Sequence, residues 1–199
     1  MPKKYIVVLI ALIFGMGALF ASCASVPTKP TAANFKNPVI TLDYIVPSYY
    51  TGWWTYGKAK VAKGKAPKFG GSSAVTLEFV FEIANPNSYP IKLSASQFFL
   101  YFDDYELRIV TDNNEMWIPA GKTNAKVMHV TLDPVTTWAK FLLAGKELSI
   151  KRGDKPWDKV SQWWKELPDM SFKIDVKEAS FTFSANGISK VVGINATYP

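Results

Sequence analysis

The stretch Ala74-Val-Thr-Leu-Glu-Phe-Val-Phe-Glu-Ile-Ala84 alternates apolar and polar side chains along its length. The apolar residues stand two positions apart, at Val75, Leu77, Phe79, Phe81 and Ile83. A β-strand points successive side chains to opposite faces, so this spacing predicts a strand with one buried face. A helix would spread the same residues around its circumference.

Shorter alternations of the same kind recur at 39–46, 97–103, 125–132, 172–176, 179–185 and 190–198. Within them Phe172, Ile174 and Val176 share one face, as do Phe181 and Phe183. Roughly seven short strands separated by turn-forming residues are typical of an antiparallel β-sandwich. We therefore predict a mainly β fold, built as an antiparallel β-sandwich.

Two segments have the spacing of helices instead. The first runs from Asp133-Pro134 to Gly145, with a capping residue, a proline at the first helical position and a glycine at the end. Its predicted buried stripe comprises Val135, Trp138, Phe141 and Leu142. The second, 156–167, places Trp157, Val160, Trp164 and Leu167 along one side, and Pro168 ends it. One or two short helices should therefore close the ends of the sandwich. The alternative for the second helix is that its amphipathic, tryptophan-bearing face lies in a membrane interface.

The N-terminus has the three-part layout of a secretory signal. Lys3 and Lys4 precede an apolar stretch, 5–21, which ends in small residues. A membrane-spanning helix needs about 17 to 25 apolar residues, so length alone also permits a transmembrane anchor.

The sole cysteine, Cys23, follows this stretch directly. A single cysteine cannot form an intramolecular disulfide or a cysteine-rich zinc site. The residues Leu19-Phe20-Ala21-Ser22-Cys23 resemble the bacterial lipobox. That resemblance implies a signal peptide over 1–22, cleavage before Cys23 and attachment of diacylglycerol to its sulfur. A transmembrane helix with an incidental cysteine is the alternative.

Lipidation would decide where the protein resides, because two or more acyl chains hold a protein stably on a membrane. Ala24 and Ser25 follow the cysteine without an aspartate at the second position, which by resemblance favours the outer membrane facing the periplasm. Residues 23–37 are then a lipid-anchored tether, and 38–199 form one domain. Loss of Lys3 and Lys4 lowers the formal net charge from +7 to +5. A mildly basic surface suits anionic lipid or polymer.

The strand predicted over 74–84 is followed by Asn85-Pro86-Asn87, which is a turn sequence. Pro86 fixes its own φ and disfavours a helical Asn85, while the amide of Asn87 can fold onto nearby backbone. The motif should end one strand and reverse the chain into the next, 89–93.

An alternating strand, an Asn-Pro-Asn corner, and paired strands around Asp103-Asp104 together resemble the LEA type 2 family, also called the water stress and hypersensitive response (WHy) domain. The resemblance extends from about Val39 to the C-terminus. It implies a sandwich of the fibronectin III or immunoglobulin kind, no catalytic activity, and a role in desiccation or stress protection, or else lipid binding in a groove. Only Asn85, Pro86 and Asn87 carry over from the family, in a structural role.

Two segments extend this sequence beyond a minimal family domain, one near 52–73 and one near 146–168. The first combines aromatic rings with positive charge, at Trp53, Trp54, Tyr56, Lys58 and Lys60. Such side chains can stack on sugars or lipid headgroups and pair with phosphates. Lipid, peptidoglycan or an envelope protein are the partners that suit an exported lipoprotein, and nucleic acid is not. The alternative is a hairpin loop whose lysines stay solvated and whose tryptophans pack on the sandwich.

No constellation of nucleophile, base and acid stands out, so we expect no enzyme, no catalytic residues, no cofactor and no metal. His129 is the single histidine and should lie on the surface. Acidic residues occur in two groups, Asp103, Asp104 and Glu106, and Asp112 with Glu115. They fall at expected turns, where aspartate is common, and lack the spacing of a calcium loop.

Overall fold

A computed structural model of the protein describes residues 29–53 and 73–199. Its strands are β1 (Val39–Tyr50), β2 (Val75–Ala84), β3 (Ile91–Phe102), β4 (Tyr105–Asp112), β5 (Met116–Ile118), β6 (Thr123–Leu132), β7 (Ile174–Ala185) and β8 (Ile188–Tyr198). Its helices are α3 (Pro134–Ala144), α4 (Lys146–Arg152), α5 (Pro156–Glu166) and the short 3-10 helix η1 (Leu167–Asp169).

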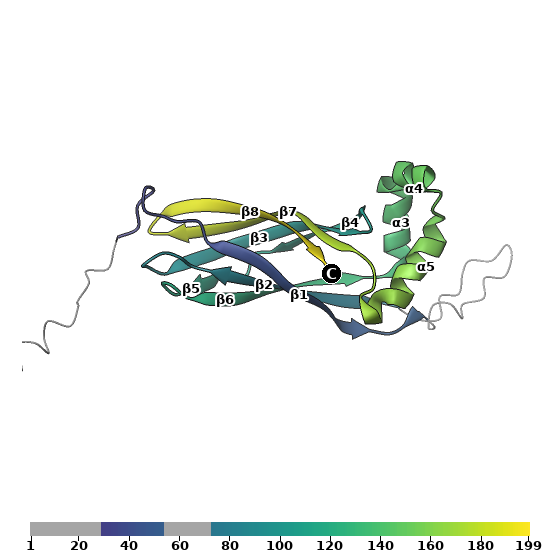
Figure 1. The fold of residues 1–199 in the computed structure, drawn as a ribbon, viewed down its shortest axis with the longest axis horizontal. Coiled ribbons are helices and arrows are strands. Elements are labelled where there is room, and N and C mark those ends of the chain that lie inside the picture. Colours follow the sequence, from purple (N-terminus) through teal and green to yellow (C-terminus); the bar gives the residue numbers. More distant parts are fainter. Residues whose placement is uncertain (1–28, 54–72) are drawn as a thin grey trace, which may run out of the picture.

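The strands form two antiparallel sheets, which confirms the predicted β-sandwich (Figure 1). One sheet has the order β1-β2-β6, and the other has the order β4-β3-β7-β8 with the short β5 paired to β3. The Asn-Pro-Asn corner therefore does more than reverse the chain. It carries the chain from β2 in one sheet to β3 in the other.

The core lies between the inner faces of the two sheets, as the alternating pattern predicts. Val75, Leu77, Phe79, Phe81 and Ile83 of β2 are all fully buried. Opposite them, Phe98 of β3 lies 4.9 Å from Phe79 between ring centroids, and Phe181 of β7 lies 5.2 Å from Phe81. The predicted faces of Phe172, Ile174, Val176, Phe181 and Phe183 also point into this core.

Two long strands contain irregularities that reverse their alternation. In β7 the buried positions change from Ile174 and Val176 to Ala179 and Phe181, across a bulge where Glu178 has φ 49°. In β3 the register shifts between Leu93 and Ala95. An extra residue at a bulge moves the following side chains to the other face. The sequence pattern therefore divides each of these single strands into two shorter ones.

Two hairpins use residues with positive φ at their turns. Asp103 (φ 45°) and Asp104 (φ 71°) join β3 to β4, and Asn186 (φ 49°) and Gly187 (φ 77°) join β7 to β8. Two consecutive residues in this region match the twist of the flanking strands, and Asn and Gly tolerate it best.

The two predicted helices are present, and a third, α4, lies between them. Asp133 caps α3, because its Oδ1 accepts hydrogen bonds from the backbone N–H groups of Val135 and Thr136 at 3.0 and 2.9 Å. Gly145 separates α3 from α4, and a Cβ there would lie 2.9 Å from the Tyr105 ring. Helix α4 is too short to show a periodic apolar pattern, so the sequence does not predict it.

The predicted buried stripes of the helices are only partly correct. Phe141 of α3 and Val160 and Trp164 of α5 are buried, but Trp138, Leu142 and Trp157 are 36%, 40% and 36% exposed. Trp163, outside the predicted stripe, is fully buried instead. These helices pack on the end of the sandwich and not on a sheet face, so each buries a narrower strip.

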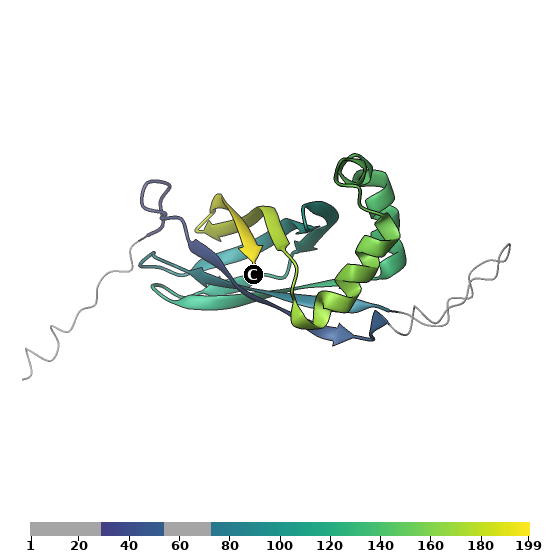
Figure 2. The ribbon, with the colours of Figure 1, turned by 45° about the vertical axis from the view of Figure 1, so that its right-hand side comes forward.

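Helices α3, α4 and α5 gather at one end of the sandwich, and the described N-terminal segment lies at the opposite end (Figures 1 and 2). The C-terminal strand β8 ends between them, along the side of the sandwich. The start of the described domain is therefore distant from the helical end.

Candidate functional surfaces

Most of the predicted contact residues lie outside the described part of the chain. These are Cys23, Trp54, Tyr56, Lys58 and Lys60. Trp53 is described and is half-buried, with its ring centroid 5.5 Å from that of Trp157 in α5. The structure thus brings one residue of the predicted aromatic segment against the helical end.

The Asn-Pro-Asn corner is held by buried side-chain amides. The Asn85 Nδ2 group donates to the backbone oxygens of Tyr89, Ile118 and Pro119 at 2.9, 3.1 and 3.1 Å. Asn85 Oδ1 accepts from the Asn87 backbone N–H at 3.0 Å and from Asn87 Nδ2 at 2.9 Å. Both asparagines are almost completely buried, so these bonds satisfy polar groups that water does not reach.

The same corner holds the segment that precedes β1. Phe35 lies within the predicted tether, yet it is 2% exposed and belongs to the core. Lys190 Nζ donates to the Phe35 carbonyl oxygen at 2.6 Å, and Tyr89 Oη hydrogen-bonds Asn34 Oδ1 at 3.0 Å. The packed domain therefore begins a few residues before β1.

Aromatic rings fill the space between the helices and the sheets. The Tyr105 ring stacks on Phe141 of α3 at 4.2 Å, and Trp163 of α5 lies 5.6 Å from Phe102 and 5.9 Å from Phe141 between centroids. Phe172 lies 4.8 Å from Phe102. Because these rings pack on one another, the contact between helices and sheets is a continuation of the core.

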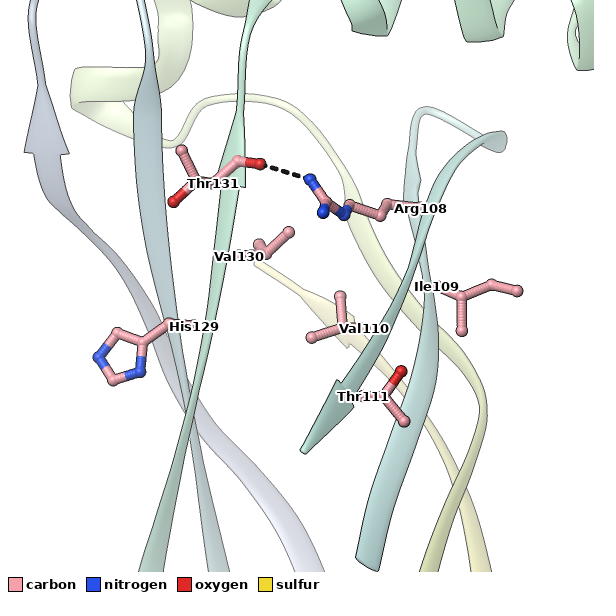
Figure 3. A pocket seen from close by; sticks show the side chains of 7 residues that line it. All are labelled: Arg108, Ile109, Val110, Thr111, His129, Val130 and Thr131. Atoms are coloured by element: carbon pink, nitrogen blue, oxygen red, sulfur yellow. Dashed lines mark hydrogen bonds between the residues drawn. The ribbon is translucent and has the colours of Figure 1, made fainter. Parts of the chain in front are cut away.

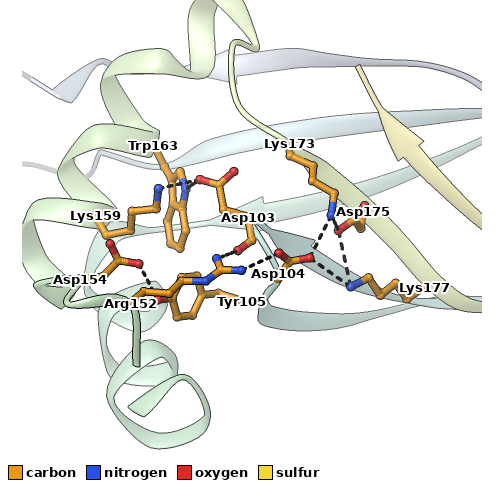
Figure 4. A network of polar contacts seen from close by, with 10 residues as sticks. All are labelled: Asp103, Asp104, Tyr105, Arg152, Asp154, Lys159, Trp163, Lys173, Asp175 and Lys177. Carbon is orange, nitrogen blue, oxygen red and sulfur yellow. Dashed lines mark hydrogen bonds and ion pairs between the residues drawn. The ribbon is translucent and has the colours of Figure 1, made fainter. Parts of the chain in front are cut away.

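A network of charged side chains covers this aromatic contact (Figure 4). Asp104 at the β3–β4 turn pairs with Arg152 of α4 at 2.8 Å and with Lys173 at 2.9 Å. Its neighbour Asp103 accepts from Lys159 Nζ at 2.7 Å and from Trp163 Nε1 at 2.9 Å. One hairpin turn thereby joins α4, α5 and the segment before β7.

The network shifts the acidity of its members. Hydrogen bonds from Arg152 and Lys173 hold the pKa of Asp104 well below its ordinary value. Burial alone would raise the pKa of Asp103, but hydrogen bonds from Lys159 and Trp163 outweigh it and lower that pKa. Burial and the hydrogen bond to Asp154 raise the pKa of Tyr105. These carboxylates therefore stay ionised and paired at neutral pH, as in a structural clasp.

The other acidic residues singled out from the sequence are paired as well. Glu106 binds Lys140 at 2.7 Å, Glu115 binds Lys92 at 2.7 Å, and Asp112 binds Lys126 at 2.9 Å. His129 is a surface residue, as predicted, with its Nε2 3.3 Å from Glu78 Oε1. Among the described residues, no three His, Cys, Asp or Glu side chains gather as a metal would require.

A shallow groove of about 200 Å³ separates the edges of β4 and β6 (Figure 3). Arg108 reaches across it and donates to the Thr131 carbonyl oxygen at 2.8 Å. Further along the same edges, Lys126 donates to the Asn114 carbonyl oxygen at 3.0 Å. Long cationic side chains that cross an open strand edge protect it from pairing with other chains.

The helical end exposes five apolar side chains, Trp138, Leu142, Leu143, Ile150 and Trp157, and we call these together with the half-buried Trp53 the apolar cap. Leu143 is 83% exposed and Ile150 71%. The Trp157 ring lies between Trp53 and Trp138, 5.5 and 6.2 Å from them between centroids. Helical spacing in the sequence predicts that Trp138, Leu142 and Trp157 are buried, and it carries no signal for Leu143 or Ile150. Within residues 29–53 and 73–199, no helix is long and apolar enough to cross a bilayer.

No protein-family model and no curated protein sequence matches the chain. Among solved structures, a crystal structure of a protein from Archaeoglobus fulgidus is similar over 82% of this chain and 93% of that one, with 9% identity and a TM-score of 0.43. The solution structure of a protein described as late embryogenesis abundant is similar over 99% of this chain and 87% of that one, with 14% identity and a TM-score of 0.30. At these scores and identities the similarities assign no family to the chain.

Proposed function

We propose that the protein is a non-enzymatic, lipid-anchored protein of the bacterial cell envelope. Its domain, of the LEA type 2 kind, would protect or scaffold other macromolecules at the membrane surface under drying or osmotic stress. The lipobox-like sequence before Cys23 supports the anchor, and the absence of an aspartate after it supports the outer membrane facing the periplasm.

The observation that carries the protective or scaffolding role is the filled contact between helices and sheets. A lipid carrier of this architecture needs an apolar groove there, and Tyr105, Phe141 and Trp163 occupy that place with mutually packed rings. A rigid interior of this kind suits a protein that acts through its surface. It does not suit one that encloses an acyl chain.

Deletion of the gene tests the proposed role. Survival after drying or osmotic shock should fall in the deletion strain and return when the wild-type chain is supplied. The Cys23→Ala chain should fail to restore survival, because it would lack the anchor. Unchanged survival of the deletion strain across these stresses would contradict the proposal.

The alternative, a lipid-binding or lipid-transfer module, makes a different prediction for native mass spectrometry. A carrier purified from membranes would retain a lipid that leaves only on activation in the gas phase. A scaffold would show the mass of the polypeptide and its covalent anchor alone. Retained lipid in proportion to protein would favour the carrier.

A further inference from the structure

We propose that the apolar cap is a second membrane contact, which inserts into the anionic bilayer that holds the lipid anchor. This inference rests on the proposed anchor. It concerns the described helical end, where exposed apolar side chains are gathered on three neighbouring elements, α3, α4 and α5.

The composition of the cap matches the interface of a bilayer. Tryptophan rings are favoured at the level of the headgroups, and aliphatic side chains enter the acyl boundary beneath them. The cap has three tryptophans in ring contact, together with Leu143 and Ile150, which are 83% and 71% exposed. A glycan would use the tryptophan rings for stacking but would leave these two aliphatic side chains in water.

Charge around the cap also suits anionic lipid. Lys146, Lys151 and Lys155 are exposed on or beside α4 and at the start of α5, where the exposed carboxylates are Glu147 and Asp158. Arg152 and Lys159 belong to the network of charged side chains described above, where Arg152 pairs with Asp104 and Lys159 with Asp103. The lysines that remain at the surface are attracted to anionic headgroups within a Debye length of the bilayer.

The anchor would bring the cap within reach of its own membrane. Eight residue steps separate Cys23 from Thr31, so the start of the packed domain stays within roughly 28 Å of the anchored sulfur. Although the cap lies at the opposite end of the domain (Figures 1 and 2), rotation about this connection lays the domain along the bilayer. Attachment of the N-terminal end to the bilayer gives the helical end a high effective concentration at the bilayer surface. A weak contact of the apolar cap is therefore enough to hold the cap on the membrane.

The test places a fluorophore in the cap of the mature lipidated protein. Leu143→Cys and Ile150→Cys each add one thiol, which is labelled with a polarity-sensitive dye. Val191→Cys is the matched control, because Val191 is 65% exposed but lies on β8, away from the helices. Each labelled protein is reconstituted into phosphatidylcholine vesicles that either contain or lack phosphatidylglycerol. Both kinds of vesicle are prepared once with brominated acyl chains and once with ordinary acyl chains.

We expect brominated acyl chains to quench the dye severalfold at positions 143 and 150, and to leave it nearly unchanged at 191. Quenching should weaken in vesicles without phosphatidylglycerol, and also when Lys151 and Lys155 are both changed to glutamate. Three outcomes would overturn the inference. The dye at positions 143 and 150 could stay in water, or it could be shielded from water without being quenched by the lipid, as a protein partner would produce. It could also be quenched only by brominated lipid in separately added vesicles, which would place the contact on a membrane other than the one that holds the anchor.

Failure of the proposed anchor is detected separately in the same experiment. The protein without an introduced cysteine takes up dye only if the Cys23 thiol is free. Labelling of that protein would contradict the anchor, whereas no labelling together with an unquenched cap would contradict only the second contact.

Discussion

Both ends of the Asn87 side-chain amide bind the backbone of Lys36. Asn87 Oδ1 accepts from the Lys36 N–H at 2.8 Å, and Asn87 Nδ2 donates to the Lys36 carbonyl oxygen at 2.9 Å. A side chain paired in this way imitates a strand neighbour. It fastens the segment that leads from the proposed anchor to the corner between the two sheets.

The first prediction concerns this pair of hydrogen bonds. Asn87→Ala removes both partners of the partly buried backbone groups of Lys36 and should lower the free energy of unfolding by about 1 to 3 kcal/mol. Urea denaturation measures the change. Asn113→Ala is the control, because Asn113 is exposed, and its effect should stay within about 0.5 kcal/mol. Equal stability of the two variants would show that the corner does not depend on the Asn87 amide.

The second prediction concerns the close approach at the junction of α3 and α4. A Cβ on Gly145 would lie 2.9 Å from Tyr105 Cδ1 and 2.9 Å from the Phe141 carbonyl oxygen. Gly145→Ala should therefore destabilise the protein by about 1 to 3 kcal/mol. At Gly193 the nearest atom would lie at 3.4 Å, an ordinary contact, so Gly193→Ala should have little effect on the thermal midpoint. Similar midpoints for both variants would contradict the tight packing of Tyr105 on α3.

The third prediction concerns acid unfolding. The folded-state pKa values of Asp103 and Asp104 are lowered, so the stabilisation they provide is complete above the unfolded pKa, about 3.9. That stabilisation is lost as the pH falls from there toward the folded-state values. The free energy of unfolding should therefore decrease steadily below about pH 4. Protonation of Asp103 and Asp104 adds to the loss that other carboxylates cause in the same range.

Asp104→Asn isolates the share of one residue in this acid sensitivity. The Asp104 side chain is partly exposed, so its ion pairs contribute only about 1 kcal/mol at neutral pH. The variant should be less stable than wild type at neutral pH, and the difference should shrink as the pH falls. Urea midpoints measured across this range give the answer. A difference that stays constant with pH would contradict the assignment of the lowered pKa to Asp104.

The strands with unbroken alternation were predictable from the sequence, and the irregular ones were not. The regular β2 keeps one apolar face from Val75 to Ile83, so its pattern predicts its structure. In β7 the buried apolar residues have even numbers before the bulge at Glu178 and odd numbers after it. A search for side chains that alternate along one strand therefore finds two short strands in place of one. Bulges depend on the partner strand, which the local sequence does not describe.

The candidate surface was less predictable than the fold. Apolar spacing placed Trp138 and Leu142 in the same buried stripe as Phe141. An apolar stripe on a helix stays exposed where no other element packs against it. Whether this happens for α3 depends on where the helix docks on the sandwich. In contrast, the sequence predicts a turn at Asp103 and Asp104. Their cationic partners are about 50 to 70 residues away in sequence and meet them only through the fold.

The mass of the mature N-terminus tests the anchor, on which both the proposed location and the second membrane contact depend. Protein purified from membranes should lack residues 1–22, begin at Cys23 and carry the added mass of diacylglycerol with an acyl chain on its amino group. The Cys23→Ala chain should carry no such addition. An intact Met1, or a free thiol at Cys23 in the wild-type protein, would contradict lipid anchoring and favour a transmembrane helix in its place.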